Sequence, residues 1–96
     1  MAPEAKVLRD VLKILNQMKA AGSPVWWVKV AGGPRQRRGL PDLHITLNGC
    51  SIWVELKAPG EEATPLQASM IRKINEAGGK AMVVHSVEEF RLAIQR

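Results

Sequence analysis

Apolar residues recur at helical spacing near the start of the chain and give way to strand-like segments further on. Residues 3–21 carry an apolar stripe at positions three and four apart, which predicts an amphipathic helix. Pro3 suits the first turn of this helix and Gly22 suits its exit. Residues 25–31 are rich in β-branched and aromatic side chains and predict a strand.

The dipeptide Asn48-Gly49 separates two further strand-like segments, residues 42–47 and 50–57. Asn-Gly is the strongest short-range signal for a β-hairpin, because a type I′ turn requires positive φ at both central residues. A two-residue turn fixes how the two strands align. The predicted pairs are Leu47–Cys50, Thr46–Ser51, Ile45–Ile52, His44–Trp53, Leu43–Val54 and Asp42–Glu55.

Two capping signals introduce the remaining helices. Residues 64–67, Thr-Pro-Leu-Gln, form a capping box with Pro at the first helical position, and residues 86–89, Ser-Val-Glu-Glu, form a second one. Gly78-Gly79 ends the first of these helices, residues 80–85 predict a short buried strand, and the terminal helix reaches about Gln95. The order is α-β-β-β-α-β-α, and a helical crossover makes the last strand pair parallel. We therefore predict one α/β domain over residues 1–96, with a mixed sheet flanked by helices.

The predicted register gives the hairpin two unlike faces. One face is aliphatic and is expected in the core: Leu43, Ile45, Leu47, Ile52, Val54 and Leu56. The other face is mixed and carries every ionisable group of the hairpin: Asp42, His44, Thr46, Ser51, Trp53, Glu55 and Lys57.

The mixed face contains the candidate chemistry. Like charges directly opposite each other on a sheet are destabilising, so the Asp42–Glu55 pair is either strained or holds a cation. Two carboxylates from adjacent strands suit Mg²⁺ or Mn²⁺, which take oxygen ligands. Lys57 beside them could orient or deprotonate a water, or neutralise charge in a transition state. The alternative is that Glu55 and Lys57 form a solvated strand face.

Composition and charge narrow the class of partner. The 96-residue chain carries a formal charge of +5, which favours a polyanion such as nucleic acid. Four basic residues gather shortly before Asp42: Lys29, Arg35, Arg37 and Arg38. The N-terminus lacks a secretory layout, no run is long enough to cross a membrane, and a single cysteine fits a reducing compartment, so we expect a cytoplasmic protein.

Pro41-Asp42, twelve intervening residues and then Glu55-Leu56-Lys57 resemble the motif of the PD-(D/E)xK nuclease superfamily. Within it the chain is most similar to stand-alone viral and prophage members of the virus-type replication-repair nuclease family, VRR-Nuc. The likeness extends over nearly the whole length through Glu4, residues 38–42, Gln67 and Gly78-Gly79. The resemblance implies a restriction-endonuclease-like core and metal-dependent hydrolysis of DNA phosphodiester bonds. It further implies a homodimer that acts on branched DNA such as four-way (Holliday) junctions.

The resemblance also implies roles for individual residues. Asp42 and Glu55 would be metal ligands, helped by the backbone carbonyl of Leu56, and Lys57 would be the catalytic lysine. Glu4 would reach the site as a ligand to a metal or to its water. The spacing does not show whether one or two metal ions bind.

Several assignments keep an alternative. Glu4 could simply favour the positive end of the first helix. Gln67 could support the site, close the capping box, or do both. We expect His44 to be a packed or substrate-facing residue and His85 to be structural. Trp26 and Trp27 must point to opposite faces of one strand, so one should be buried while the other could meet a subunit partner.

A non-catalytic DNA-binding module on the same fold is the alternative function. It would use the same basic loop without divalent-dependent turnover. It is less favoured, because an unused pair of opposed acids should cost stability.

Overall fold

The computed structural model describes residues 2–30 and 38–95, and its elements follow the predicted order. They are α1 (Pro3–Ala20), β1 (Val25–Lys29), β2 (Leu43–Leu47), β3 (Cys50–Leu56), α2 (Pro65–Glu76), β4 (Lys80–Val84) and α3 (Val87–Ile94). The α/β class and the order of elements are confirmed, and element ends differ from the predicted ones by one or two residues. None of the helices in the described ranges is long and apolar enough to cross a membrane.

The four strands form one mixed sheet in the order β1-β2-β3-β4. Strands β1, β2 and β3 are antiparallel neighbours, and β4 is parallel to β3, as the helical crossover predicted. The hairpin register is confirmed at each pair from Leu47–Cys50 to Leu43–Val54. Its turn has φ values of 51° at Asn48 and 80° at Gly49, which are the positive angles that a type I′ turn requires.

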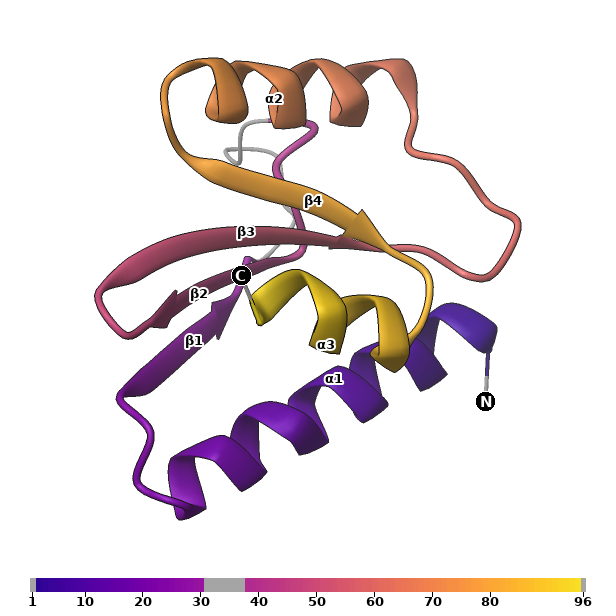
Figure 1. Ribbon diagram of the computed structural model, residues 1–96. Helices are drawn as coiled ribbons and strands as arrows, with labels where there is room; N and C mark the ends of the chain where they lie inside the picture. The colour runs from indigo at the N-terminus through magenta and orange to yellow at the C-terminus, as the bar shows by residue number, and fades with distance from the viewer. Residues whose placement is uncertain (1, 31–37, 96) are drawn as a thin grey trace.

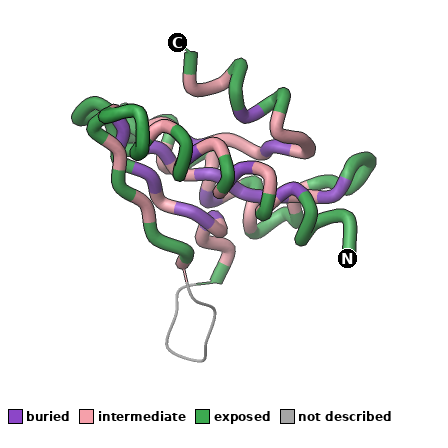
Figure 2. The backbone as a smooth tube through the Cα atoms, turned by 90° about the horizontal axis from the view of Figure 1, so that it is seen from below, coloured by how far each residue is buried: buried purple, intermediate pink, exposed green. Residues whose placement is uncertain are grey.

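The helices lie in two layers. Figure 1 shows α2 on one face of the sheet and α1 with α3 on the other. The aliphatic hairpin face packs against α1 and α3, and the buried cluster comprises Val7, Val11, Leu15, Leu43, Ile45, Leu47, Ile52, Val54, Leu56, Val84 and Phe90. Figure 2 shows these buried positions along the strands and the helices that enclose them. The prediction that this face forms the core is confirmed.

The first predicted capping box is complete. Thr64 Oγ1 accepts from the Gln67 N–H at 3.2 Å, and Gln67 Oε1 accepts from the Thr64 N–H at 2.9 Å. This exchange satisfies two backbone donors that a helix N-terminus otherwise leaves without partners. It also fixes the position of the Gln67 side chain at the start of α2.

The second predicted capping box is only half formed. Ser86 Oγ accepts from the Glu89 N–H at 3.2 Å, as expected. The carboxylate of Glu89, however, accepts from the backbone N–H of His85 at 2.8 Å rather than from that of Ser86. The nearby imidazole of His85 attracts the same carboxylate oxygen, which explains the one-residue displacement.

His85 ties α3 to the segment that joins β3 to α2. Its Nδ1 lies 3.1 Å from Glu89 Oε2 and its Nε2 lies 2.8 Å from the Glu61 carbonyl oxygen. Both ring nitrogens therefore face acceptors, an arrangement that only the doubly protonated imidazolium satisfies. The Glu89 carboxylate, and then the Glu61 carbonyl, raise the pKa of His85 above its usual value. The contacts fit the structural role expected for this residue.

We expect His85→Asn to lower stability more at acidic than at alkaline pH. A raised folded-state pKa means that the stabilising contribution of the ring is complete below about pH 6.5 and is lost as pH rises through the folded-state value. The ring is partly exposed, so the contribution should be about 0.5 kcal/mol. Thermal unfolding of both chains between pH 5.5 and 9 measures it, with Lys13→Gln as a control. A difference from wild type that does not change with pH would contradict a charged His85.

Candidate metal centre

Three carboxylates meet where β3 ends and the chain enters β2. Asp42 directly precedes β2, Glu55 lies in β3, and Glu4 comes from the first turn of α1. One oxygen from each carboxylate lies within 4.8 Å of the others. The fold thus brings together the three acids that the sequence singled out, although Glu4 and Glu55 lie 51 positions apart along the chain.

Asp42 is held at both its backbone and its side chain. Its carbonyl oxygen accepts from the Val30 N–H at 2.8 Å, which extends the pairing of β1 with β2 by one step. Toward β3, Asp42 Oδ2 accepts from the Leu56 N–H at 2.9 Å. The second strand was predicted to begin at Asp42 but begins at Leu43, because the Asp42 side chain takes this bond to β3.

Glu55 is the buried acid of the group. Its residue surface is only 2 % exposed, and its Oε1 has no hydrogen-bond partner in the described part of the chain. Its Oε2 accepts from Gln67 Nε2 at 3.2 Å and lies 3.8 Å from Lys57 Nζ. Burial raises the pKa of Glu55 to about 8, and the neighbouring Asp42 carboxyl adds to this rise, while the Lys57 ammonium opposes it.

The three carboxylates and the Oε1 atom of Glu55 show whether a cation would fit between Glu4, Asp42 and Glu55. A buried polar atom without a partner costs roughly 1–3 kcal/mol, and more when it is charged. A divalent cation among Glu4, Asp42 and Glu55 would pair with Glu55 Oε1 and offset the repulsion between the acids. Carboxylate oxygens are the ligands that Mg²⁺ and Mn²⁺ prefer. The donor set present therefore fits a hard divalent ion, whereas Lys57 alone leaves the pKa of Glu55 raised.

Gln67 joins the start of α2 to this centre. Its Oε1 completes the capping box with Thr64, while its Nε2 donates to Glu55. The capping function and a supporting function at the site therefore coexist in one side chain. α2 is also held to β4, because the Asn75 side chain bonds both the N–H and the carbonyl oxygen of Ala81.

The structure describes two of the four basic residues that were predicted to bind DNA, Lys29 and Arg38. Lys29 lines a cleft of about 350 Å³ together with Glu4, Asp42 and Leu56, so one cation of the predicted set reaches the site. Arg38 is exposed at the entry to β2. The other two predicted contacts, Arg35 and Arg37, lie outside the described residues.

His44 lies apart from the cluster of acids. Its ring stacks on Trp53 with centroids 4.0 Å apart and planes inclined by 6°, and its Nε2 lies 2.6 Å from Ser51 Oγ. This geometry matches the expectation of a packed residue rather than a ligand.

Sequence reasoning missed the bond from the Leu56 amide to Asp42, since no pattern indicates that a side chain will replace a backbone partner.

Comparison with known proteins assigns the fold. The whole chain superposes on a solved structure named "VRR_NUC domain" with a TM-score of 0.81 and 20% sequence identity, covering 98% of that chain. The predicted fold family is thereby confirmed at the level of the fold. The chain has the architecture of a VRR_NUC domain.

A curated relative adds similarity in sequence. The chain is 43% identical over 51 residues to "Putative nuclease p44" of Acyrthosiphon pisum secondary endosymbiont phage 1. The matched segment covers 52% of this chain and 55% of that protein, so the chain spans about half the length of its relative. No family profile matches the chain.

We expect Glu55→Gln to remove both a pH-dependent destabilisation and a response to divalent ions. Because the folded-state pKa of Glu55 is about 8, the metal-free protein should lose stability as pH rises from about 4.5 to 8, and the neutral amide should abolish that loss. Mn²⁺ at 100 times its dissociation constant should stabilise the wild-type chain by about 2.7 kcal/mol.

Thermal unfolding of both chains, with EDTA or with Mn²⁺, measures the two effects. Glu88→Gln removes an exposed acid from α3 and should respond as the wild-type chain does. An equal Mn²⁺ stabilisation of Glu55→Gln and the wild-type chain would contradict the assignment of Glu55 as a ligand.

Proposed function

We propose that this protein is a Mg²⁺- or Mn²⁺-dependent DNA endonuclease that hydrolyses phosphodiester bonds. The proposal rests mainly on one observation: the buried Glu55 carboxylate has an oxygen without a partner among residues 2–30 and 38–95, within a three-acid cluster and with a lysine directly beside it. Gln67 and Lys57 compensate Oε2 of this group, and a bound cation would compensate Oε1. The VRR_NUC-type fold and the nuclease name of the phage relative support the same activity.

The side chains divide the chemistry among them. Asp42 and Glu55 would hold the ion, with Glu4 as a ligand to the ion or to its water and the Leu56 carbonyl as a further donor. When bound, the ion would polarise a phosphoryl oxygen and lower the pKa of a water molecule.

Two further residues act beside the ligands. Lys57, whose side chain is 12% exposed, would orient or deprotonate the attacking water, or neutralise charge in the transition state. Gln67 would keep the Glu55 carboxylate in place while the substrate binds.

The substrate belongs to the polyanions that a basic protein attracts. With a formal charge of +5, the chain would bind backbone phosphates through Lys29, Arg35, Arg37 and Arg38. Phosphate contacts carry little sequence information, so selection by DNA shape is the expected mode. The proposal includes a preference for branched DNA such as four-way junctions. It also includes a cytoplasmic location, where the protein would encounter such DNA.

We expect Asp42→Asn and Lys57→Ala each to lower cleavage by about 100-fold or more while the protein remains folded and still binds DNA. The first change removes a ligand and the second removes the group that handles the water. A cleavage panel of linear, flap and four-way DNA, with Mn²⁺ or with EDTA, measures both activity and substrate preference. Lys73→Ala removes one charge from α2 and should keep the wild-type rate.

Unchanged cleavage by both site variants would exclude the assigned roles. Binding of branched DNA by the wild-type chain without divalent-dependent cleavage would instead identify a non-catalytic DNA-binding module on the same fold.

We also expect a homodimer. A chain of 10.6 kDa offers limited surface for branched DNA, and a two-fold symmetric protein suits a substrate with matching symmetry. Sedimentation equilibrium should therefore give about twice the mass of one chain. A mass of one chain, both free and on DNA, would reject this part of the proposal while leaving the catalytic roles unaffected.

A further inference from the structure

The mixed face of the sheet is covered unevenly. Figure 1 shows α2 lying over β4, and its Gln67 reaches only as far as Glu55 in β3. Strands β1 and β2 lie beyond β3 in the sheet order, on the side away from α2. Among the described residues, no helix therefore covers the half of this face that lies over β1 and β2.

A large aromatic side chain stands on this open half. Trp26 is 60% exposed and pairs with Thr46, and Val28 is 41% exposed and pairs with His44. Paired residues project to the same face of a sheet, so Trp26 and Val28 share the face of the stacked His44–Trp53 rings. Tryptophan presents a large flat aromatic face, so its exposure here makes that face available for contact with a ligand.

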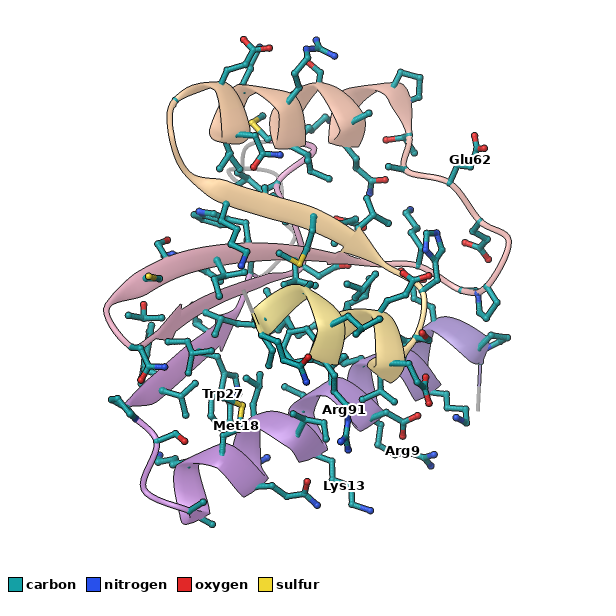
Figure 3. All side chains as sticks on the ribbon, viewed as in Figure 1. Arg9, Lys13, Met18, Trp27, Glu62 and Arg91 are labelled. Atoms are coloured by element: carbon teal, nitrogen blue, oxygen red, sulfur yellow. The ribbon has the colours of Figure 1, made fainter. Side chains whose placement is uncertain are left out.

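Its neighbour in sequence shows the opposite behaviour. Trp27 packs against the core beside Met18, as Figure 3 shows, and Lys19 Nζ lies 5.9 Å from its ring centroid. One tryptophan was expected to be buried, and Trp27 is partly buried while Trp26 is exposed. Contacts among the described residues thus account for Trp27 but leave most of the Trp26 side chain exposed.

The position of Trp26 relates it to the metal centre. Its partner Thr46 lies four residues from Asp42 along β2, which corresponds to about 13 Å at the usual rise of a strand. The side chains across this part of the face are aromatic, aliphatic, imidazole or hydroxyl groups, and none is acidic: Trp26, Val28, His44, Thr46, Ser51 and Trp53. A negatively charged strand bound at the metal centre could follow this face without meeting a like charge.

We infer that Trp26 is a stacking platform for an unpaired nucleobase of the DNA, a few nucleotides from the bond that is cut. The inference rests on the proposed nuclease function. Stacking on an aromatic side chain requires an exposed base face, which branch points and single-stranded segments present and a continuous duplex does not. Trp26 would therefore contribute to a preference for branched over linear DNA.

A second copy of the chain is the competing occupant. A stable interface buries about 800 Å² on each partner, whereas a whole tryptophan side chain buries about 150–250 Å². On this half of the face, Trp26 and Val28 are the exposed large apolar side chains of the described residues. Their combined apolar surface is smaller than such an interface but comparable to one nucleobase. The size of this apolar patch thus favours a base.

The test compares three substitutions at position 26, each made together with Lys57→Ala so that the DNA remains intact. The probes are a four-way junction with unpaired nucleotides at its branch point and a continuous duplex of equal length. Trp26→Ala should weaken junction binding by roughly 5- to 100-fold and change duplex binding by less than about twofold. Trp26→Phe, which keeps an aromatic face, should retain most of the affinity, whereas Trp26→Leu should not.

Leu92→Ala is the matched control, because it removes another exposed apolar side chain, 66% exposed, from α3. It should bind both probes as the Lys57→Ala parent does. Thermal midpoints within a few degrees of the parent confirm that each variant is folded. If Trp26→Ala unfolds, the comparison of junction affinity between Trp26→Phe and Trp26→Leu still tests the inference.

Three results would overturn the inference. They are parent-like junction affinity in Trp26→Ala, equal affinities for Trp26→Phe and Trp26→Leu, and a sedimentation mass that Trp26→Ala lowers from two chains to one.

Cleavage by the chain that keeps Lys57 distinguishes the two proposals. If that chain cuts junctions with and without Trp26 equally well, only the platform is wrong, and if it neither binds nor cuts DNA, the proposed function itself fails.

Discussion

The burial of one carboxyl group constrains the rest of the site. Glu55 lies in a central strand of the sheet with 2% of its surface exposed and a second acid, Asp42, beside it. Removing a charge from water is costly unless partners replace the water, and a nearby like charge adds to the cost. Gln67 and Lys57 reach one oxygen of Glu55, and the Leu56 amide satisfies Asp42 instead. The other oxygen of Glu55, Oε1, has no hydrogen-bond partner among the described residues. A cation bound there would supply the missing partner, which is why the cluster suits a cation.

The hairpin turn determines which side chains meet there. A slip of one residue at Asn48-Gly49 would move every side chain of β3 to the opposite face, placing Glu55 in the aliphatic core. The positive φ angles at both turn residues hold the register from Leu47–Cys50 to Leu43–Val54, and this register leaves Asp42 close to Glu55 just beyond the last pair. The backbone conformation of the turn thereby determines which side chains meet at the cluster of acids, about 20 Å away along the strands at the usual rise per residue.

The sequence carried the parts of the structure that depend on local patterns. Turn chemistry and alternation predicted the hairpin and its aliphatic face, and the Thr64 capping signal predicted where α2 begins. What failed depended on competition between neighbours in space. Glu89 had the right spacing to cap Ser86, yet the His85 imidazole shifts its carboxylate by one residue. The contact between Asp42 and the Leu56 amide and the exposure of Trp26 likewise depend on tertiary packing, which single-chain periodicity does not report.

The three helices of the described residues cover the two faces of the four-stranded sheet unevenly. α1 and α3 enclose the aliphatic face, and α2 lies over β4 and reaches the cluster of acids through Gln67. The same placement that brings the Gln67 amide to Glu55 leaves the β1–β2 half of the face without a covering helix in the described part of the chain, and so accessible to an extended ligand.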